Sequence, residues 1–290
     1  MVDERSTVRE GPNFGPYASW ESVAAFSALS EQAFAAFDET VEANWKKFTR
    51  PVHHLFIRMA YQAKSTSLAV RLNTSWALLL PAFALTRVRL EQTIVSSYLM
   101  HEDESIGLEA FVRFLPIGEY KGLQAAMEDQ ALAKELARIV DLQESQATAA
   151  GAQDWFTPGF SLENDRFERS WTKLNLRSMA KRRDSLVRGK GFAFGENLER
   201  SYVSIYKTAS SVIHADCSSL AHGYLNLYSS PSGQLVLMPV PTWAIISTSC
   251  TACYDIIQCY EILNWLGIAV SDTYLMLGRC WMAARDKYIP

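Results

Sequence analysis

The chain has 290 residues, of which 28 are Lys or Arg and 31 are Asp or Glu, so its formal net charge is -3. Because 49% of the residues are hydrophobic, the chain can bury a large core, and this composition excludes a disordered protein and a globally cationic nucleic-acid binder. Five cysteines are too few for a disulfide scaffold, and the acidic start MVDERSTVRE lacks the pattern of a signal peptide. We therefore expect a cytoplasmic protein with reduced thiols.

Residues 1–18 combine glycines and prolines with little periodicity, and we expect them to form an irregular leader. Over residues 20–48 large apolar side chains recur every three to five positions, which predicts a helix with one buried face. Pro51 suits the first turn of a second helix, because its missing N–H would have no partner there. The apolar residues of this second helix are Leu55, Met59, Leu68 and Leu72.

Helices are predicted along most of the remaining chain. A third one, from about Pro81 to Met100, is rich in Leu, Val and Ile and carries a few polar groups. The later helices are expected over residues 105–145, 164–186, from 196 onward, 242–266 and 271–285. The segment near residues 225–240 has instead the pattern of two short strands around a Ser-Pro-Ser-Gly turn.

One stretch, Val236–Tyr254, contains no charged residue and is long enough to cross a bilayer. Two prolines, Pro239 and Pro241, and several hydroxyl side chains favour a helix buried in the centre of a bundle over a membrane span. We therefore predict no membrane association. The fold class is an all-α multi-helix bundle with a small β-hairpin insertion near residues 225–240, and residues 19–290 are expected to form a single helical domain.

The third helix contains the spacing Arg87-x-x-x-Glu91. Residues four apart lie on one helix face, and in an apolar segment each charge is costly without a partner, so the two are expected to pair. The pair is either a structural ion pair or an anion-binding arginine that is oriented by its glutamate.

A second constellation is Tyr206-x-x-x-Ser210-x-x-x-His214, whose phenol, hydroxyl and imidazole are expected to follow one helix face. The ordinary pKa of histidine lies near neutral pH, which suits His214 for proton transfer, with Ser210 orienting it and Tyr206 donating to an oxyanion or phosphate. The alternative is a buried histidine whose hydrogen bonds are satisfied.

Three segments of the chain resemble, in their order, an uncharacterised bacterial family of helical proteins that is catalogued as a domain of unknown function. They are the R-x-x-x-E helix, a spacer with Trp171 and a basic helix, and the Y-x-x-x-S-x-x-x-H helix, and the resemblance covers about residues 50–266. It extends to the HEPN-like helical bundles, many of which act as ribonucleases in phage defence and toxin systems. The catalytic positions that it implies are Arg87, Glu91, Tyr206, Ser210 and His214.

The chain departs from the HEPN nucleases in one respect. Those enzymes carry an R-x4-6-H motif on one helix, and no arginine precedes His214 or His222 at that distance.

A basic tract occurs between the two constellations. Lys173, Arg177 and Lys181 recur every four residues and are expected to form a stripe that neutralises phosphates, unless they are simply a solvated helix face. The candidate nucleic-acid-binding residues are Lys173, Arg177, Lys181, Arg182 and Arg183. Phe192 and Phe194 follow as candidate stacking groups.

No metal or other cofactor is expected. The pairs His214-x-x-Cys217 and Cys250-x-x-Cys253 have a spacing that zinc permits, but cysteine in an apolar helix usually behaves as a small hydrophobe. The chain also lacks the glycine-rich phosphate loops and the G-x-S-x-G elbow of common enzyme classes.

Two functional hypotheses follow. The first is a HEPN-like, metal-independent ribonuclease or RNA-binding effector of phage defence or toxin systems, in which His214 transfers protons and Arg87 stabilises charge on phosphorus. The second is a non-enzymatic sensor or adaptor that binds a small anionic ligand or a partner protein. RNA or a nucleotide is the expected ligand, and a homodimer through the apolar C-terminal helices is the expected assembly.

Overall fold

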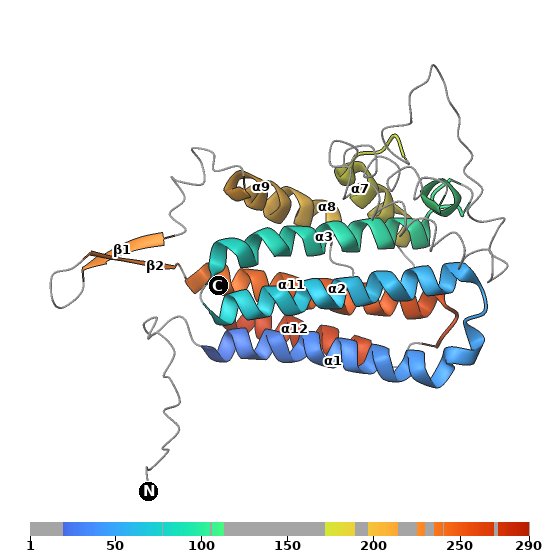
Figure 1. Ribbon diagram of the computed structural model, residues 1–290, viewed down its shortest axis with the longest axis horizontal. Coiled ribbons are helices and arrows are strands. Elements are labelled where there is room, and N and C mark those ends of the chain that lie inside the picture. Colours follow the sequence, from blue (N-terminus) through green and yellow to red (C-terminus); the bar gives the residue numbers. More distant parts are fainter. Residues whose placement is uncertain are drawn as a thin grey trace, which may run out of the picture.

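The computed structural model describes residues 20–76, 78–104, 106–112, 172–188, 197–213, 225–229, 235–239, 241–269 and 272–289. Helices dominate this part of the chain, which confirms the predicted all-α multi-helix fold. The expected leader and most of the helical region expected over residues 105–145 lie outside the described residues. Figure 1 shows the long helices lying side by side along the long axis of the molecule.

The first part of the bundle consists of three long helices joined by short connections. α1 spans Trp20–Asn44 and passes into a 3-10 turn, η1, at Trp45–Lys47. α2 spans Pro51–Ser75 and begins at the predicted proline, and α3 spans Leu79–His101. The face of α1 that its hydrophobic spacing predicted is buried, as Phe26, Phe34, Phe37 and Val41 show.

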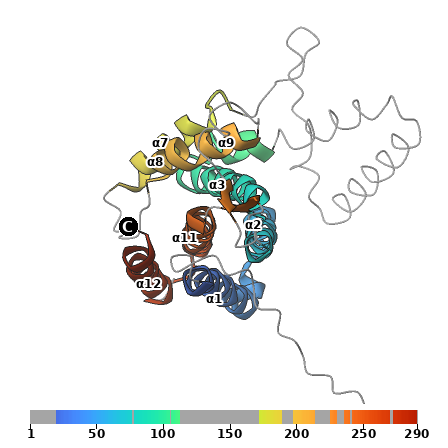
Figure 2. The same ribbon diagram turned by 90° about the vertical axis from the view of Figure 1, so that its left-hand side faces the viewer.

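The helix α11 (Pro241–Trp265) lies in the centre of the bundle. It packs against α1, α2, α3 and α12 (Asp272–Tyr288), and these helices surround it in Figure 2. The uncharged stretch that ends at Tyr254 therefore belongs largely to a buried central helix, as predicted. None of the described helices has the length and hydropathy that a membrane span requires.

The closing helix α12 is tied to the bundle by two buried hydrogen bonds. The Tyr274 hydroxyl donates to the Ala33 carbonyl at 2.8 Å, and the Trp281 indole N–H donates to the Ser249 carbonyl at 2.8 Å. These bonds satisfy the polar ends of two large aromatic side chains that the core encloses. Helices from both ends of the described chain thus complete the same core.

A second layer covers the face of α3 that points away from α11 (Figure 2). It contains α7 (Leu176–Val187), α8 (Leu198–Ser201), a π-helical turn η2 (Tyr202–Tyr206) and α9 (Lys207–Ile213). The Asp184 carboxylate of α7 accepts the backbone N–H groups of Leu198 at 3.2 Å and Glu199 at 2.9 Å. This capping contact fixes the start of α8 against α7 and so places η2 and α9 over α3.

Two short strands, β1 (Leu225–Ser229) and β2 (Leu235–Pro239), pair in antiparallel orientation with Leu227 opposite Leu237. In Figure 1 they project beyond the end of the helical bundle.

The predicted apolar face of α2 is wrong in its second half. Leu68 and Leu72 are 47% and 52% exposed to solvent. The buried face keeps helical spacing, but its second half contains only small, apolar or hydroxyl side chains. Its members are Val52, Phe56, Ala60, Ala63, Ser67, Val70 and Thr74. The reason lies in the core, where Ser67 donates a hydrogen bond to the buried Asp255 at 2.7 Å. In the second half of this helix the largest apolar side chains therefore do not mark the inner face.

Candidate functional site

Arg87 and Glu91 form the ion pair that their spacing predicts. The Nε of Arg87 donates to Oε1 of Glu91 at 3.0 Å, one turn further along α3. The two side chains are 19% and 37% exposed. This pair lies at the surface that α3 presents to the second layer, within reach of water.

Tyr206 of the second layer also holds the guanidinium of Arg87 in place. The Nη2 of Arg87 donates to the Tyr206 hydroxyl at 2.8 Å, and its guanidinium carbon lies 4.3 Å from the centroid of the tyrosine ring. The two residues are 119 positions apart in the sequence. A guanidinium that contacts a carboxylate, a phenol oxygen and an aromatic ring has little rotational freedom left.

The π-helical turn η2 presents two tyrosines at this point. The backbone N–H of Lys207 donates to the Tyr202 carbonyl, which is the wider hydrogen-bond step of a π-helix. The rings of Tyr202 and Tyr206 stack with centroids 4.4 Å apart and an interplanar angle of 18°. Burial, and to a lesser extent Tyr206, raises the pKa of the Tyr202 phenol, so this group remains a neutral hydrogen-bond donor at physiological pH. Turns of this kind often occur at functional sites.

The structure brings together three of the five candidate catalytic residues. Arg87, Glu91 and Tyr206 are in contact, as given above, whereas Ser210 is half-buried on α9, one turn beyond Tyr206. His214 lies outside the described residues. The role of His214 in proton transfer therefore stays a prediction.

Acidic side chains pair with most of the arginines in the basic tract, which comprises α7 and the residues just before it. Arg177 pairs with Glu199 at 3.0 Å, and Arg182 forms two hydrogen bonds with Glu102 at 2.8 and 3.0 Å. Arg182 in turn helps to hold the pKa of Glu102 below its ordinary value, against the effect of burial. Of the five candidate residues, only Lys173 and Lys181 have no ion pair with a described residue.

The prediction that Arg183 belongs to a nucleic-acid interface is wrong. Its side chain is fully buried and forms ion pairs with Glu261 of α11 and with Asp184. An arginine in the interior of the bundle cannot contact a phosphate backbone. α7 begins at Leu176, so Lys173 precedes the helix, and only Arg177 and Lys181 of the predicted stripe lie on it. Both of these residues are exposed, whereas Arg183 is buried.

A buried charge network joins α3 and α11, and no local sequence pattern predicted it. Arg89 donates from Nε to Oδ1 of Asp255 at 2.7 Å, and both side chains are 0% exposed. Ser30 and Ser67 donate to the same carboxylate at 2.5 and 2.7 Å. Burial raises the pKa of Asp255, whereas Arg89 and the two serines favour its charged form.

A second buried carboxylate, Glu261, accepts hydrogen bonds from Arg183 and Ser97. The His101 Nε2 lies 3.3 Å from its Oε1. Burial acts to raise the pKa of Glu261, but Arg183 and His101 outweigh it and lower the pKa to about 2. The Asp255 network joins α1, α2, α3 and α11 within the bundle, whereas the Glu261 network joins α3 and α11 to α7 of the second layer. We interpret both networks as structural.

No group of three His, Cys, Asp or Glu side chains with metal-binding geometry occurs within the described ranges. Cys250 and Cys253, whose spacing zinc permits, lie on α11 without a disulfide bond, and Cys253 is buried. Cys217 and His214 lie outside the described residues.

Comparison with known proteins returned one match. The model of DUF5677, described as a family of unknown function, matches residues 49–232. No curated protein and no solved structure matches the chain. The matched residues contain Arg87, Glu91, Tyr206 and Ser210, whereas Asp255 and Glu261, the buried partners of Arg89 and Arg183, lie beyond them. Helix α11, outside the matched segment, therefore supplies the counter-charges for two arginines within it.

Proposed function

We propose that this chain, which belongs to the DUF5677 family, binds single-stranded RNA through one phosphate group held by Arg87, and that His214 cleaves the strand there. The observation that supports the binding step is the geometry of the guanidinium. Glu91 engages its Nε and Tyr206 engages its Nη2, and its Nη1 makes no hydrogen bond with a described residue. A pre-oriented guanidinium at a partly exposed position is well suited to a phosphate oxygen.

The stacked tyrosines support RNA as the ligand class. Proteins recognise single-stranded RNA largely by stacking unpaired bases on aromatic side chains. Tyr206 already contacts Arg87 on its ring, so the ring of Tyr202 is the platform that we assign to a base. In this arrangement Arg87 of α3 binds the phosphate and Tyr202 of η2 stacks on the base, and the hydrogen bond from Arg87 to Tyr206 joins α3 to η2.

The proposed cleavage uses the 2′-hydroxyl of the RNA as the nucleophile. His214 takes the proton from this hydroxyl, the 2′-oxygen bonds to phosphorus, and the P–O5′ bond breaks. Water protonates the departing O5′, which leaves a 2′,3′-cyclic phosphate and a 5′-hydroxyl end. Arg87 stabilises the negative charge that grows on the phosphate oxygens, with Tyr206 and Ser210 as further donors. Such an activity suits the phage-defence or toxin role that the HEPN resemblance implies.

A second candidate is a sensor that binds a small phosphorylated ligand without cleaving it. The ion pairs Arg177–Glu199 and Arg182–Glu102 favour this candidate, because they leave few cations on α7 to follow a long backbone. A ligand with a single phosphate requires Arg87 alone.

The test incubates the purified chain with end-labelled single-stranded RNA in EDTA and measures both binding and cleavage. We expect Arg87→Met to weaken binding about 10-fold to 100-fold, the range for one charge-assisted hydrogen-bond partner. His214→Ala is expected to retain binding and abolish cleavage. The control is Arg285→Met, which removes a 44% exposed arginine of α12 that is likewise paired with a carboxylate, that of Asp286.

Binding by the parent that Arg87→Met leaves unchanged contradicts the proposed site. Binding that requires Arg87 without any cleavage by the parent supports the sensor instead. Thermal melting of each variant separates loss of function from loss of fold.

A further inference from the structure

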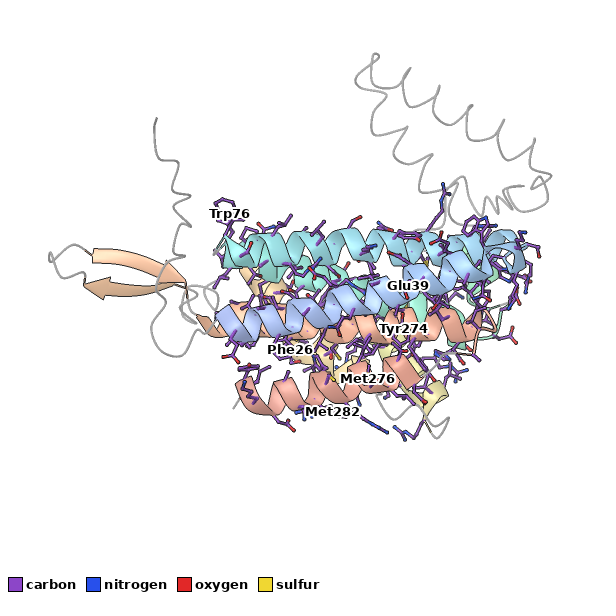
Figure 3. The ribbon with its side chains drawn as sticks, turned by 90° about the horizontal axis from the view of Figure 1, so that it is seen from below. Phe26, Glu39, Trp76, Tyr274, Met276 and Met282 are labelled. Atoms are coloured by element: carbon purple, nitrogen blue, oxygen red, sulfur yellow. The ribbon has the colours of Figure 1, made fainter. Side chains whose placement is uncertain are left out.

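We propose that two copies of this chain pair through the outer face of α2 and the start of α3. Large apolar side chains are concentrated there, and we call them the α2–α3 apolar face. Its members are Leu68, Leu72, Trp76, Leu78 and Leu80. Trp76 is 73% exposed, and Figure 3 shows it at one end of the bundle, where α2 ends. Exposed apolar groups gathered in this way usually mark an interaction surface.

This face is also free of exposed charge. Every described residue from Tyr61 to Val88 that is exposed, rather than buried or half-buried, is uncharged. The charged residues Lys64, Arg71 and Arg87 within the same stretch are only partly exposed. Each forms an ion pair with an acidic residue, which is Asp38, Glu31 or Glu91 respectively. Depletion of charge combined with exposed aromatic and aliphatic side chains is the composition of an interface centre.

The spacing on α2 fits a second copy of the same helix. Leu68, Leu72 and Trp76 recur every four residues and so follow one side of the helix. A two-fold axis near Leu72 sets α2 antiparallel to its copy and brings Trp76 of each chain onto Leu68 of the other. Because the face has no exposed charge, its copy meets no like charge across the contact.

Other occupants fit this face less well. An anionic membrane surface or a nucleic acid is attracted by exposed cations, and the face has none among its described residues. Of the C-terminal helices, which we expected to pair, α11 is enclosed by α1, α2, α3 and α12, and the large apolar side chains exposed on α12 are Met276 and Met282. The proposal therefore places the homodimer contact on α2.

Light scattering coupled to size-exclusion chromatography, over a concentration series of the full chain, tests the proposal. The parent is expected at twice the chain mass of 32.6 kDa. Leu72→Arg and Leu72→Glu each place like charges near the two-fold axis and are expected to be monomeric, whereas an equimolar mixture of the two is expected to recover the dimer. Met276→Arg, at a 56% exposed methionine of α12, is the matched control and is expected to remain dimeric.

A parent that stays monomeric over the whole series overturns the proposal, and so does a Leu72→Arg variant that remains dimeric. A mixture of Leu72→Arg and Leu72→Glu that stays monomeric, with both variants showing parental melting, overturns the placement of the axis at Leu72. A monomeric parent that co-floats with phosphatidylcholine vesicles overturns the proposal in favour of a lipid surface.

Discussion

Replacing Asp255 by Ala removes the anionic partner of a fully buried arginine. Asp255 accepts hydrogen bonds from Arg89, Ser30 and Ser67, and every one of these side chains is enclosed by the bundle. In the variant the charge of Arg89 remains buried without a counter-charge. Breaking a buried ion pair in this way costs about 3–5 kcal/mol of unfolding free energy. For a chain of this size, that loss corresponds to a fall in Tm of about 10 °C.

Urea unfolding followed by circular dichroism measures this loss, through the midpoint at an unchanged slope m. Asp286→Ala is the control, because its 68% exposed side chain is expected to change stability by less than about 0.5 kcal/mol. The double variant Arg89→Met with Asp255→Leu removes both charges and is expected to recover most of the stability. A loss below about 1 kcal/mol for Asp255→Ala would refute the reasoning.

Two further predictions concern Glu261 and Asp184. The pKa of Glu261 is lowered from 4.5 to about 2, so its carboxylate stabilises the fold above about pH 4.5 and loses this effect as the pH falls towards 2. Glu261→Gln should therefore flatten the acid dependence of the unfolding free energy, measured by denaturant titration at stepped pH. Glu104→Gln, which changes an exposed ion pair, should not. Asp184→Ala removes the carboxylate that accepts two backbone N–H groups at the start of α8, next to the N-cap Asn197, and is expected to cost about 1 kcal/mol in the same assay. An unfolding free energy equal to that of the parent would contradict the capping role.

Local spacing predicted those parts of the fold that depend on neighbours in the sequence. Arg87 and Glu91 are four residues apart on one helix, so their pairing follows from helix geometry alone. The central position of α11 follows similarly from its lack of a charged face before Asp255. The contact between Arg87 and Tyr206, across 119 residues, joins two of the catalytic positions that the family resemblance implies, and helix geometry alone does not predict it.

Contacts between residues far apart in the sequence account for what spacing did not predict. Arg89 and Arg183 resemble other basic residues of their helices, and only the positions of Asp255 and Glu261 on α11 decide that they are buried. The same network explains the exposed leucines of α2, because the inner positions of that helix include Ser67, which faces Asp255. A buried polar contact can thus place hydroxyl side chains on the inner face of a helix while leucines of the same helix stay exposed.

The salt dependence of RNA binding tests the central claim most directly. For a single strand, each phosphate that the protein neutralises contributes about 0.7 to the slope of log K against log of salt concentration. If Arg87 holds one phosphate, Arg87→Met lowers the magnitude of the slope by about 0.7, and Arg285→Met leaves it unchanged. An Arg87→Met variant with the slope of the parent would show that the phosphate binds elsewhere, and it would contradict the account.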